Sequence, residues 1–201
     1  MSAQVAALAE PDAQPIGNGV FIAVVGPSGA GKDSVIHFAQ NALAGDERVH
    51  FVRRVITRPS DPDAEDHDTL EEAEFIEAER DGAFTLSWQA HGLHYGLPAS
   101  VDGRVADGAA AIANLSRNAI PALHARYANV IVAEITASPE ILADRLSARG
   151  RESRGEVLAR LARSAPLDAS LPGVVKIDNS GALEIAGARF VAMVREALSQ
   201  S

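Results

Sequence analysis

The sequence predicts an α/β domain built on a mainly parallel, doubly wound sheet. The first observation is a continuous run of six apolar residues, Val20–Val25, which is typical of a strand buried on both faces of a parallel sheet. The second is a glycine-rich loop at 26–32 that connects this run to a helical pattern at 33–44. The third is the return of apolar strands at 109–115 and 129–135, each followed by a helical segment. Strands that alternate with helices in this way favour a parallel sheet.

The remaining elements are expected from periodicity, capping residues and turn composition. Residues 1–18 are rich in Ala, Gln and Pro, which indicates a loose leader, and the acidic stretch 60–68 indicates an exposed loop. Residues 91–96 have the composition of a turn. The helix that begins near Ser138 has a capping hydroxyl and a proline in its first turn. Strands are expected at 49–56, 84–89 and 174–177, and helices at 70–80, from 138 onward and at 183–198.

Composition limits both the architecture and the partners. With 201 residues and 47% hydrophobic content, the chain can bury one sizeable core, so we expect a single domain with inserted lobes. The formal charge of −9 disfavours a nucleic-acid partner, and a small anionic substrate held by a few arginines fits better. The absence of cysteine excludes disulfides and thiolate zinc sites. Neither a secretory signal nor an apolar run of about 20 residues is found, so we expect no membrane attachment and a cytoplasmic location.

The segment from Gly26 to Lys32 has the composition of a phosphate-binding loop, or P-loop. Its glycines let successive backbone N–H groups approach a phosphate, and the start of the following helix adds a partial positive charge. Lys32 and Lys176 are the only lysines in the chain, which argues against a chance occurrence at the end of the loop. We expect Lys32 to reach the β- and γ-phosphates of ATP. The expected ATP-binding residues here are Gly26, Pro27, Ser28, Gly29, Ala30, Gly31, Lys32, Asp33 and Ser34.

The residue after Lys32 departs from the usual P-loop pattern, in which a serine or threonine ligates Mg²⁺. Asp33 takes this place and Ser34 follows it. Two interpretations are open: Asp33 holds Mg²⁺ directly or through water, since a hard oxygen ligand suits this ion, or Ser34 does so after a small shift. A carboxylate beside a triphosphate is repelled unless a cation lies between them, which favours Asp33. The expected phosphoryl donor is ATP with Mg²⁺.

Four linked stretches, at 26–32, 57–59, 94–96 and 145–151, resemble the guanylate kinase superfamily of nucleoside monophosphate kinases. The resemblance implies a P-loop NTPase core, an acceptor-binding lobe inserted after the second strand, and an arginine-rich lid. The implied boundaries are a leader at 1–18 and a single kinase domain at 19–201, with a core at 19–53, 100–144 and 166–201, an insertion at 54–99 and a lid at 145–165.

Within that superfamily, the chain resembles the ribose 1,5-bisphosphate phosphokinases more closely than the guanylate kinases. The stretches that carry this closer resemblance are 31–34, 57–59, 87–96, 114–117 and 177–181. The resemblance implies transfer of the γ-phosphoryl group of ATP to ribose 1,5-bisphosphate. The implied products are phosphoribosyl diphosphate and ADP, in bacterial phosphonate catabolism.

Departures from the guanylate kinase pattern agree with this resemblance. Asp61 stands where guanylate kinases carry a second arginine, Leu70 near their phosphate-binding tyrosine, and Leu97 where a hydroxyl reads guanine. At 114–117, an asparagine and then an arginine replace an acidic strand-end motif. Losing a carboxylate and gaining a guanidinium suits an acceptor with more phosphate and no base.

Arginines dominate the candidate acceptor site. Arg58 precedes a proline, which holds it extended, and its guanidinium can grip a phosphate with two parallel bonds; the alternative is a surface pair with the acidic loop. Arg117 directly follows an apolar strand, where open α/β sheets bind ligands; the alternative is a solvent-facing residue at a helix start. Tyr95 either bonds the acceptor or is a buried structural tyrosine. The candidate acceptor-binding residues are Arg54, Arg58, Tyr95, Asn114, Ser116 and Arg117.

Catalysis is expected from Lys32 and two lid arginines. Arg145 and Arg149 lie four residues apart on one helix face, where they would neutralise charge on the transferred phosphoryl group. The alternative is a solvated basic face. Asp178 and Asn179 fall where related kinases hold adenine, so the resemblance implies that they bind ATP. No general base is required, because the acceptor oxygen is already a phosphate anion.

Other polar and aromatic residues are expected to be structural. Trp88 is expected to pack the inserted lobe. Glu134 ends the apolar run 130–133 and so imitates a Walker B carboxylate, but a structural role is expected. His91 and His94 lie in a turn without metal-ligand partners, and lining the ribose site is the alternative for both. Two rival functions stay open: guanylate kinase activity, and a non-catalytic guanylate-kinase-like interaction module. The oligomeric state is also open, with a homodimer as one option.

Overall fold

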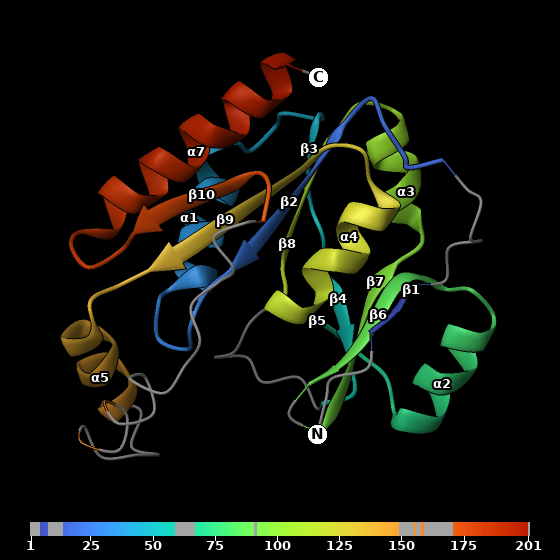
Figure 1. Cartoon of the computed structure of the whole chain (residues 1–201), viewed down its shortest axis with the longest axis horizontal. Coiled ribbons are helices and arrows are strands. Elements are labelled where there is room, and N and C mark those ends of the chain that lie inside the picture. The colour runs from blue at the N-terminus through green and yellow to red at the C-terminus, as the bar shows by residue number, and fades with distance from the viewer. Residues whose placement is uncertain are drawn as a thin grey trace.

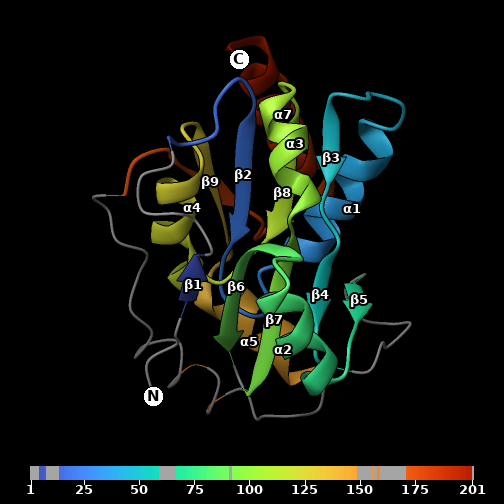
Figure 2. The same cartoon turned by 90° about the vertical axis from the view of Figure 1, so that its right-hand side faces the viewer.

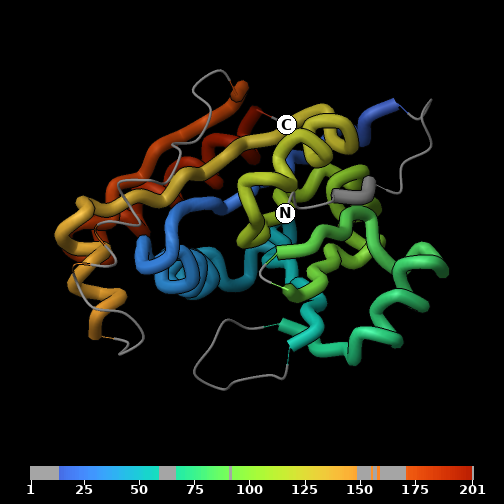
Figure 3. Tube along the Cα trace, turned by 60° about the horizontal axis from the view of Figure 1, so that its bottom comes forward, coloured from blue at the N-terminus to red at the C-terminus, as the bar shows by residue number. Residues whose placement is uncertain are grey.

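Two five-stranded sheets form the scaffold of the molecule, one in a core and one in a smaller lobe. The computed structural model describes residues 5–7, 14–58, 67–90, 92–148, 155, 158 and 171–200. Figure 3 shows the two parts side by side, with α1, α5 and α7 on one side and the lobe with α2 on the other.

The core sheet is parallel throughout. In spatial order its strands are β10 (Val174–Asp178), β9 (Val130–Thr136), β2 (Val20–Val25), β8 (Ala110–Asn114) and β3 (Val49–Phe51). All four strand pairings are parallel. The central strand β2 is buried along its whole length, as a continuous apolar run requires. The predicted mainly parallel sheet is confirmed.

Helices cover both faces of the core sheet (Figure 1). Helices α1 (Lys32–Ala42) and α7 (Leu183–Gln200) pack on one face, and α3 (Ser100–Ala106) and α4 (Ile120–Arg126) on the other. Alternate residues of β2 supply the two cores: Ile22 faces α1 and α7, whereas Phe21 faces the opposite layer. Each such fully buried side chain contributes about 1.5–3 kcal/mol of transfer free energy. The doubly wound arrangement is therefore confirmed.

Helix α5 (Pro139–Ser147) follows β9 and starts where the sequence predicts. The Ser138 hydroxyl accepts a hydrogen bond from the backbone N–H of Ile141 at 3.3 Å, and Pro139 occupies the first turn. None of the described helices has both the length and the apolar character needed to cross a bilayer.

The lobe is built on a mixed sheet beyond the carboxyl ends of the core strands (Figure 2). In spatial order its strands are β1 (Val5–Ala7), β6 (Phe84–Ala90), β7 (Leu93–Pro98), β4 (Arg54–Ile56) and β5 (His67–Thr69). Helix α2 (Glu72–Arg80) packs against this sheet through Phe75, whose ring stacks on that of Phe84 with centroids 4.6 Å apart. Helix α2 begins with a capping box formed by Glu71 and Glu74.

Two predictions about the lobe are wrong. A single strand at 49–56 is instead two strands, because the chain leaves the core sheet after Phe51 and enters the lobe sheet at Arg54. The turn predicted at 91–96 is instead largely strand β7, paired antiparallel with β6. This position of β7 requires glycine, because a Cβ on Gly96 would come within 2.6 Å of the Phe84 ring. His67–Thr69, at the end of the predicted acidic loop, form β5.

Part of the predicted leader pairs with the rest of the molecule. Val5–Ala7 form β1, antiparallel to β6 of the lobe. Ile16 bridges to the core, where its N–H bonds the carbonyl of Arg126 at 2.9 Å and its carbonyl accepts from Ala128 at 2.8 Å. The segment before β2 therefore contacts both the lobe and the core.

A partly buried polar network also joins the lobe to the core. The carboxylate of Asp102 in α3 accepts hydrogen bonds from the hydroxyls of Thr85 in β6 at 2.8 Å and of Tyr127 at 2.7 Å. It also accepts one from the guanidinium of Arg126 at the end of α4. Three donors on one carboxylate fix β6 against α3 and α4.

Candidate active site

The glycine-rich loop lies between β2 and α1 at the carboxyl end of the core sheet. Gly29 and Gly31 both have φ near +84°, a conformation that other residues rarely adopt. A Cβ on Gly26 would come within 2.2 Å of the carbonyl oxygen of Ile135 in β9. The loop path therefore requires glycine at these positions, as a P-loop does.

The side chain of Lys32 folds back along the loop. Its ammonium donates to the carbonyl oxygens of Gly26 at 3.0 Å and Pro27 at 3.3 Å. These bonds hold the cation beside the backbone that would surround a phosphate.

Two residues from outside the loop brace it. The buried amide of Asn179 donates to the carbonyl of Ala30 at 2.8 Å. The guanidinium of Arg145 donates to the carbonyl of Asn179 at 2.9 Å and to that of Gly29 at 3.4 Å. Arg145 and Asn179 are thus both brought to the loop, although Arg145 contacts its backbone here.

Asp178, the other predicted adenine-site residue, is engaged locally. Its carboxylate accepts hydrogen bonds from the hydroxyl of Ser180 at 2.6 Å and from the Ser180 N–H at 3.0 Å. These two donors, the hydroxyl first, hold the pKa of the Asp178 carboxyl below its ordinary value. The side chain therefore shapes the turn after β10.

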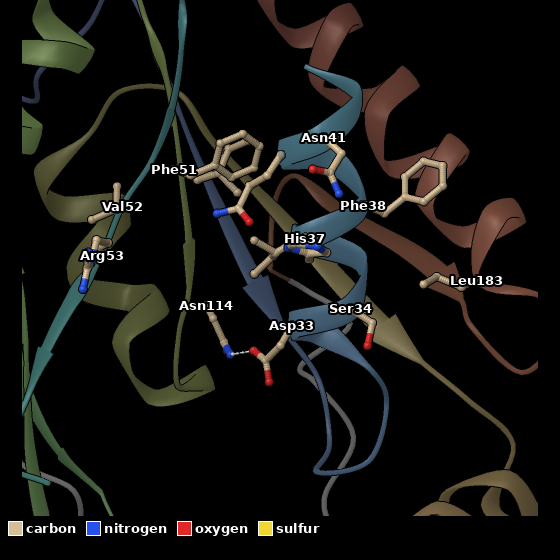
Figure 4. A pocket seen from close by; sticks show the side chains of 13 residues that line it. Asp33, Ser34, His37, Phe38, Asn41, Phe51, Val52, Arg53, Asn114 and Leu183 are labelled. Atoms are coloured by element: carbon tan, nitrogen blue, oxygen red, sulfur yellow. Dashed lines mark hydrogen bonds between the residues drawn. The ribbon is translucent and has the colours of Figure 1, made fainter. Parts of the chain in front are cut away.

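The carboxylate of Asp33, in the first turn of α1, meets the amide of Asn114 at the end of β8. The Asn114 Nδ2 donates to the Asp33 Oδ1 at 2.9 Å, and among the described residues it is the one side-chain donor to this carboxylate. Asp33 is exposed, whereas Asn114 is 8% exposed. Both residues line a cavity of about 550 Å³ between α1 and the β3 and β8 edge, together with His37, Phe51 and Arg53 (Figure 4).

The residues present fit a magnesium ion. In the described ranges, no group of three or more His, Cys, Asp or Glu side chains is arranged to hold a metal. Magnesium does not need such a group, because it is commonly bound by one or two protein oxygens, several waters and the substrate phosphates. Asp33 offers an exposed carboxylate at the end of the P-loop. Ser34 projects from α1 away from Asn114 (Figure 4).

Arg117 pairs with a buried carboxylate. It lies in the short 3₁₀ helix η1 (Arg117–Ala119) after β8, and its guanidinium is 3.4 Å from the Oε1 of Glu134, whose side chain is 6% exposed. Lys176 lies 4.0 Å from the other oxygen of Glu134. Ser116 caps η1 by accepting from the Asn118 N–H at 3.3 Å.

Glu134 is expected to be structural, and the sequence does not reveal its partners. The signal available in the sequence was a lone carboxylate at the end of an apolar strand. The structure gives that carboxylate two cationic neighbours at the edge of the site.

The predicted lobe residues gather around β4 and β7. Arg54 is buried and its guanidinium lies 5.5 Å from the centroid of the Tyr95 ring, which stacks on Trp88 with centroids 5.4 Å apart. The Arg58 carbonyl accepts from the Thr69 hydroxyl at 3.0 Å. Within the described part of the chain, the buried Nε of Arg58 has no hydrogen-bond partner.

Some predicted residues lie outside the described ranges. These are Arg149 of the lid, Asp61 of the acidic loop and His91 of the hairpin. His94 is described, and its ring packs against Phe75 and lies 3.5 Å from a Glu72 carboxylate oxygen.

Comparison with known proteins gives close relatives. No family model matches the chain. The chain is 54% identical over 163 residues to "Ribose 1,5-bisphosphate phosphokinase PhnN" of Brucella melitensis biotype 2, which covers 81% of this chain and 85% of the relative. It is 50% identical over 190 residues to the protein of the same name from Chelativorans sp., covering 93% and 90%. It is 45% identical over 181 residues to the protein of the same name from Agrobacterium fabrum, which covers 90% of this chain and 99% of the relative.

A solved structure supports the same fold. The guanylate kinase of Anaplasma phagocytophilum superposes with a TM-score of 0.65 at 17% identity, over 90% of this chain and 86% of that one. At this identity the similarity concerns the fold alone. The predicted likeness in architecture to the guanylate kinases is confirmed.

Proposed function

Because the chain belongs to the ribose 1,5-bisphosphate phosphokinase family, we propose that it transfers the γ-phosphoryl group of ATP to ribose 1,5-bisphosphate. The products are phosphoribosyl diphosphate and ADP, and the reaction serves phosphonate catabolism in the cytoplasm. The observation that carries the proposal is the P-loop braced by Asn179 and Arg145, with the Lys32 ammonium bonded along its backbone.

The loop and the core hold the donor. Backbone N–H groups of residues 26–31 and the ammonium of Lys32 bind the β- and γ-phosphates, and the turn at Asp178 and Asn179 borders the adenine. Asp33 or Ser34 would hold a magnesium ion, which would neutralise charge on the phosphates. The braces from Arg145 and Asn179 keep the loop in shape before ATP arrives.

Two groups of residues hold the acceptor's two phosphates. Arg54, Arg58 and Tyr95 form the first group, in the insertion at 54–99. The buried Nε of Arg58, which has no hydrogen-bond partner among the described residues, supports a phosphate in this position. The second group lies after β8, where Arg117 forms one wall of the site and Ser116 shapes the turn.

The reaction itself is an in-line transfer between phosphate oxygens. An oxygen of the acceptor's 1-phosphate attacks the γ-phosphorus, the bond from that phosphorus to the bridging oxygen of the β-phosphate breaks, and ADP leaves. The attacking oxygen is already anionic, so no side chain has to remove a proton. The protein contributes position and positive charge, and the lid at 145–165 with Arg145 and Arg149 excludes water as it closes.

An acceptor panel tests this proposal. ADP release is measured with ribose 1,5-bisphosphate, GMP, ribose 5-phosphate and no acceptor, and the product is identified by phosphorus NMR. We expect a diphosphate signal with ribose 1,5-bisphosphate and little turnover with GMP. Equal or faster turnover with GMP would establish guanylate kinase activity in its place.

The Lys32→Ala variant tests whether the chain is a kinase or a non-catalytic interaction module. Lys176→Ala is the matched control, because it removes the other lysine, whose side chain is 74% exposed. We expect the Lys32 variant to lose at least 10²-fold in kcat/KM, about 2.7 kcal/mol of transition-state stabilisation, and the control to stay near wild type. If Lys32→Ala keeps every activity of the protein, the chain is not a kinase.

A further inference from the structure

The contact between Asp33 and Asn114 joins two positions that have defined roles in P-loop enzymes. Asp33 directly follows the loop lysine, and Asn114 is the last residue of β8, the strand beside β2. In P-loop enzymes, a serine or threonine hydroxyl at the first position ligates Mg²⁺, and an aspartate at the end of a neighbouring strand supplies the negative charge. Here the helix carries the carboxylate and the strand carries a neutral amide.

We propose that these two positions have exchanged roles: Asp33 is the protein's magnesium ligand, and Asn114 is a positioning residue that orients it. This inference rests on the proposed function only in taking MgATP as the donor. It also removes Asn114 from the predicted acceptor-binding residues, because its amide N–H is directed at Asp33 at 2.9 Å.

The geometry favours Asp33 over Ser34 as the ligand. Asn114 donates to Oδ1 alone, so Oδ2 of the exposed Asp33 carboxylate is left to face the ion. Asn114 is itself held by burial at the end of a sheet strand, which makes it a firm support. Ser34 projects from α1 away from this pair (Figure 4).

The exchange keeps the number of carboxylates but moves the charge toward the phosphates. A carboxylate next to the loop repels a nucleotide when magnesium is absent and attracts the ion when it is present. A hydroxyl in the same place does neither. Nucleotide binding by this chain should therefore depend on magnesium more steeply than binding by a P-loop with serine.

The first experiment measures binding of a non-hydrolysable ATP analogue by calorimetry, in excess EDTA and in excess Mg²⁺. For Asp33→Asn, we expect metal-free affinity to rise about tenfold, from loss of one repulsion across ~5 Å of partly solvated space. The Mg²⁺ enhancement, which is the factor by which Mg²⁺ raises the affinity for the ATP analogue, should fall at least tenfold. Ser34→Ala tests the competing ligand: if Asp33 holds the ion, this variant keeps both values within about twofold, which is less than 0.5 kcal/mol. Arg48→Ala, which removes a surface pair with Asp46, is the control and should leave both values unchanged. An Asp33→Asn variant with wild-type metal enhancement would overturn the assignment, as would a Ser34→Ala variant that loses it.

The second experiment tests the role of Asn114 with an exchange of side chains. Asn114→Asp alone places two carboxylates side by side, so it should weaken metal-free binding of the ATP analogue relative to wild type. Asp33→Ser alone should lose the magnesium enhancement. The double variant Asp33→Ser/Asn114→Asp restores the usual P-loop arrangement and should recover the enhancement to within about threefold of wild type. If the effects of the two single changes simply add, Asn114 does not act through Asp33.

Two further readouts keep these outcomes interpretable. Asp33 is exposed, so its variants should fold, and thermal unfolding of each protein checks this directly. Asn114→Ala provides a second test at the buried position: the Mg²⁺ enhancement should fall while the acceptor KM of the active enzyme stays within about threefold, under 0.7 kcal/mol. An acceptor KM raised tenfold with normal Mg²⁺ enhancement would return Asn114 to the acceptor site. Because the calorimetry needs no acceptor, its result stands even if ribose 1,5-bisphosphate proves not to be the substrate.

Discussion

Replacing Arg117 with alanine should produce two separable losses, one of stability and one of acceptor binding. In the structure, the Arg117 guanidinium lies 3.4 Å from a Glu134 oxygen, and the Glu134 side chain is 6% exposed. Removing the arginine leaves a buried carboxylate with Lys176, at 4.0 Å, as its remaining cationic neighbour among the described residues. Any change in activity would therefore be mixed with a structural cost.

The structural cost can be estimated. A hydrogen bond to a charged group contributes about 1.5–3 kcal/mol, and the long 3.4 Å contact together with compensation by Lys176 places this one near the lower bound. For a domain of this size, a loss of about 1.5 kcal/mol lowers the melting temperature by about 3–6 °C. The loss of the Arg117 contact to an acceptor phosphate should raise the acceptor KM about tenfold or more. A factor of ten corresponds to about 1.4 kcal/mol of binding free energy.

A second substitution separates the two effects. In Arg117→Ala/Glu134→Gln no buried charge is left, so the melting temperature should return to within about 1 °C of wild type, below the shift of about 2–4 °C expected for a loss of 1 kcal/mol. The acceptor KM should stay raised in the double variant. Arg48→Ala is the control, because Arg48 pairs with Asp46 on the surface and its side chain is 65% exposed. If the acceptor KM is normal in both Arg117 variants, Arg117 contributes stability alone and the acceptor site lies elsewhere.

Two other predictions follow from the braced loop and the partly buried polar network. Asn179→Ala removes the 2.8 Å bond to the Ala30 carbonyl and leaves that buried oxygen unpaired, at a cost of about 1–3 kcal/mol. ATP should bind about tenfold more weakly in calorimetry while the acceptor KM is unchanged, and normal ATP affinity would contradict a bracing role. Burial, and then the hydrogen bond to Asp102, raise the pKa of Tyr127 above its ordinary value of 10.0. The folded state thus holds this proton more tightly than the unfolded state, so its contribution is complete below pH 10 and is lost as the pH rises further. Urea midpoints between pH 9 and 11.5 should fall less steeply for Tyr127→Phe than for wild type, and equal slopes would contradict the assignment.

The core of the fold was predictable because its strands are buried on both faces. Such strands appear in the sequence as unbroken apolar runs, and Val20–Val25 and the run ending in Asn114 are both found where they were expected. The cap at Ser138 likewise marks its helix start through a local hydrogen bond. These signals are encoded by neighbours in the sequence, so they can be read without knowing the tertiary structure.

The lobe was harder to predict because its strands are chosen by distant partners. No breaking residue separates Phe51 from Arg54, and the switch between sheets there depends on β8 on one side and β7 on the other. Strand β7 contains polar residues and Gly96, a composition typical of a turn. Gly96 leaves room for the ring of Phe84, twelve residues earlier, and no local sequence pattern reveals this requirement.

The candidate site divides in the same way. The P-loop and its lysine form a contiguous motif and were predicted residue by residue, including the anomaly at Asp33. The partners were not predicted: Asn114 reaches Asp33 from 81 residues away, and Glu134 is 17 residues from Arg117. Both pairs depend on the order and alignment of the strands in the core sheet, which hydrophobic periodicity alone does not determine.

The pairing of β1 with the lobe has a mechanical consequence. The chain enters the lobe between Phe51 and Arg54 and leaves it after Pro98, and these two crossings lie close together because β4 and β7 are adjacent and antiparallel. Two neighbouring crossings act as a hinge about which a sheet can swing. The chain also connects β1, at the far edge of that sheet, covalently to Ile16, which bridges to the core. This connection limits how far the β1 edge can move from the core, so the freest motion belongs to the opposite edge, where Thr69 of β5 bonds the Arg58 carbonyl.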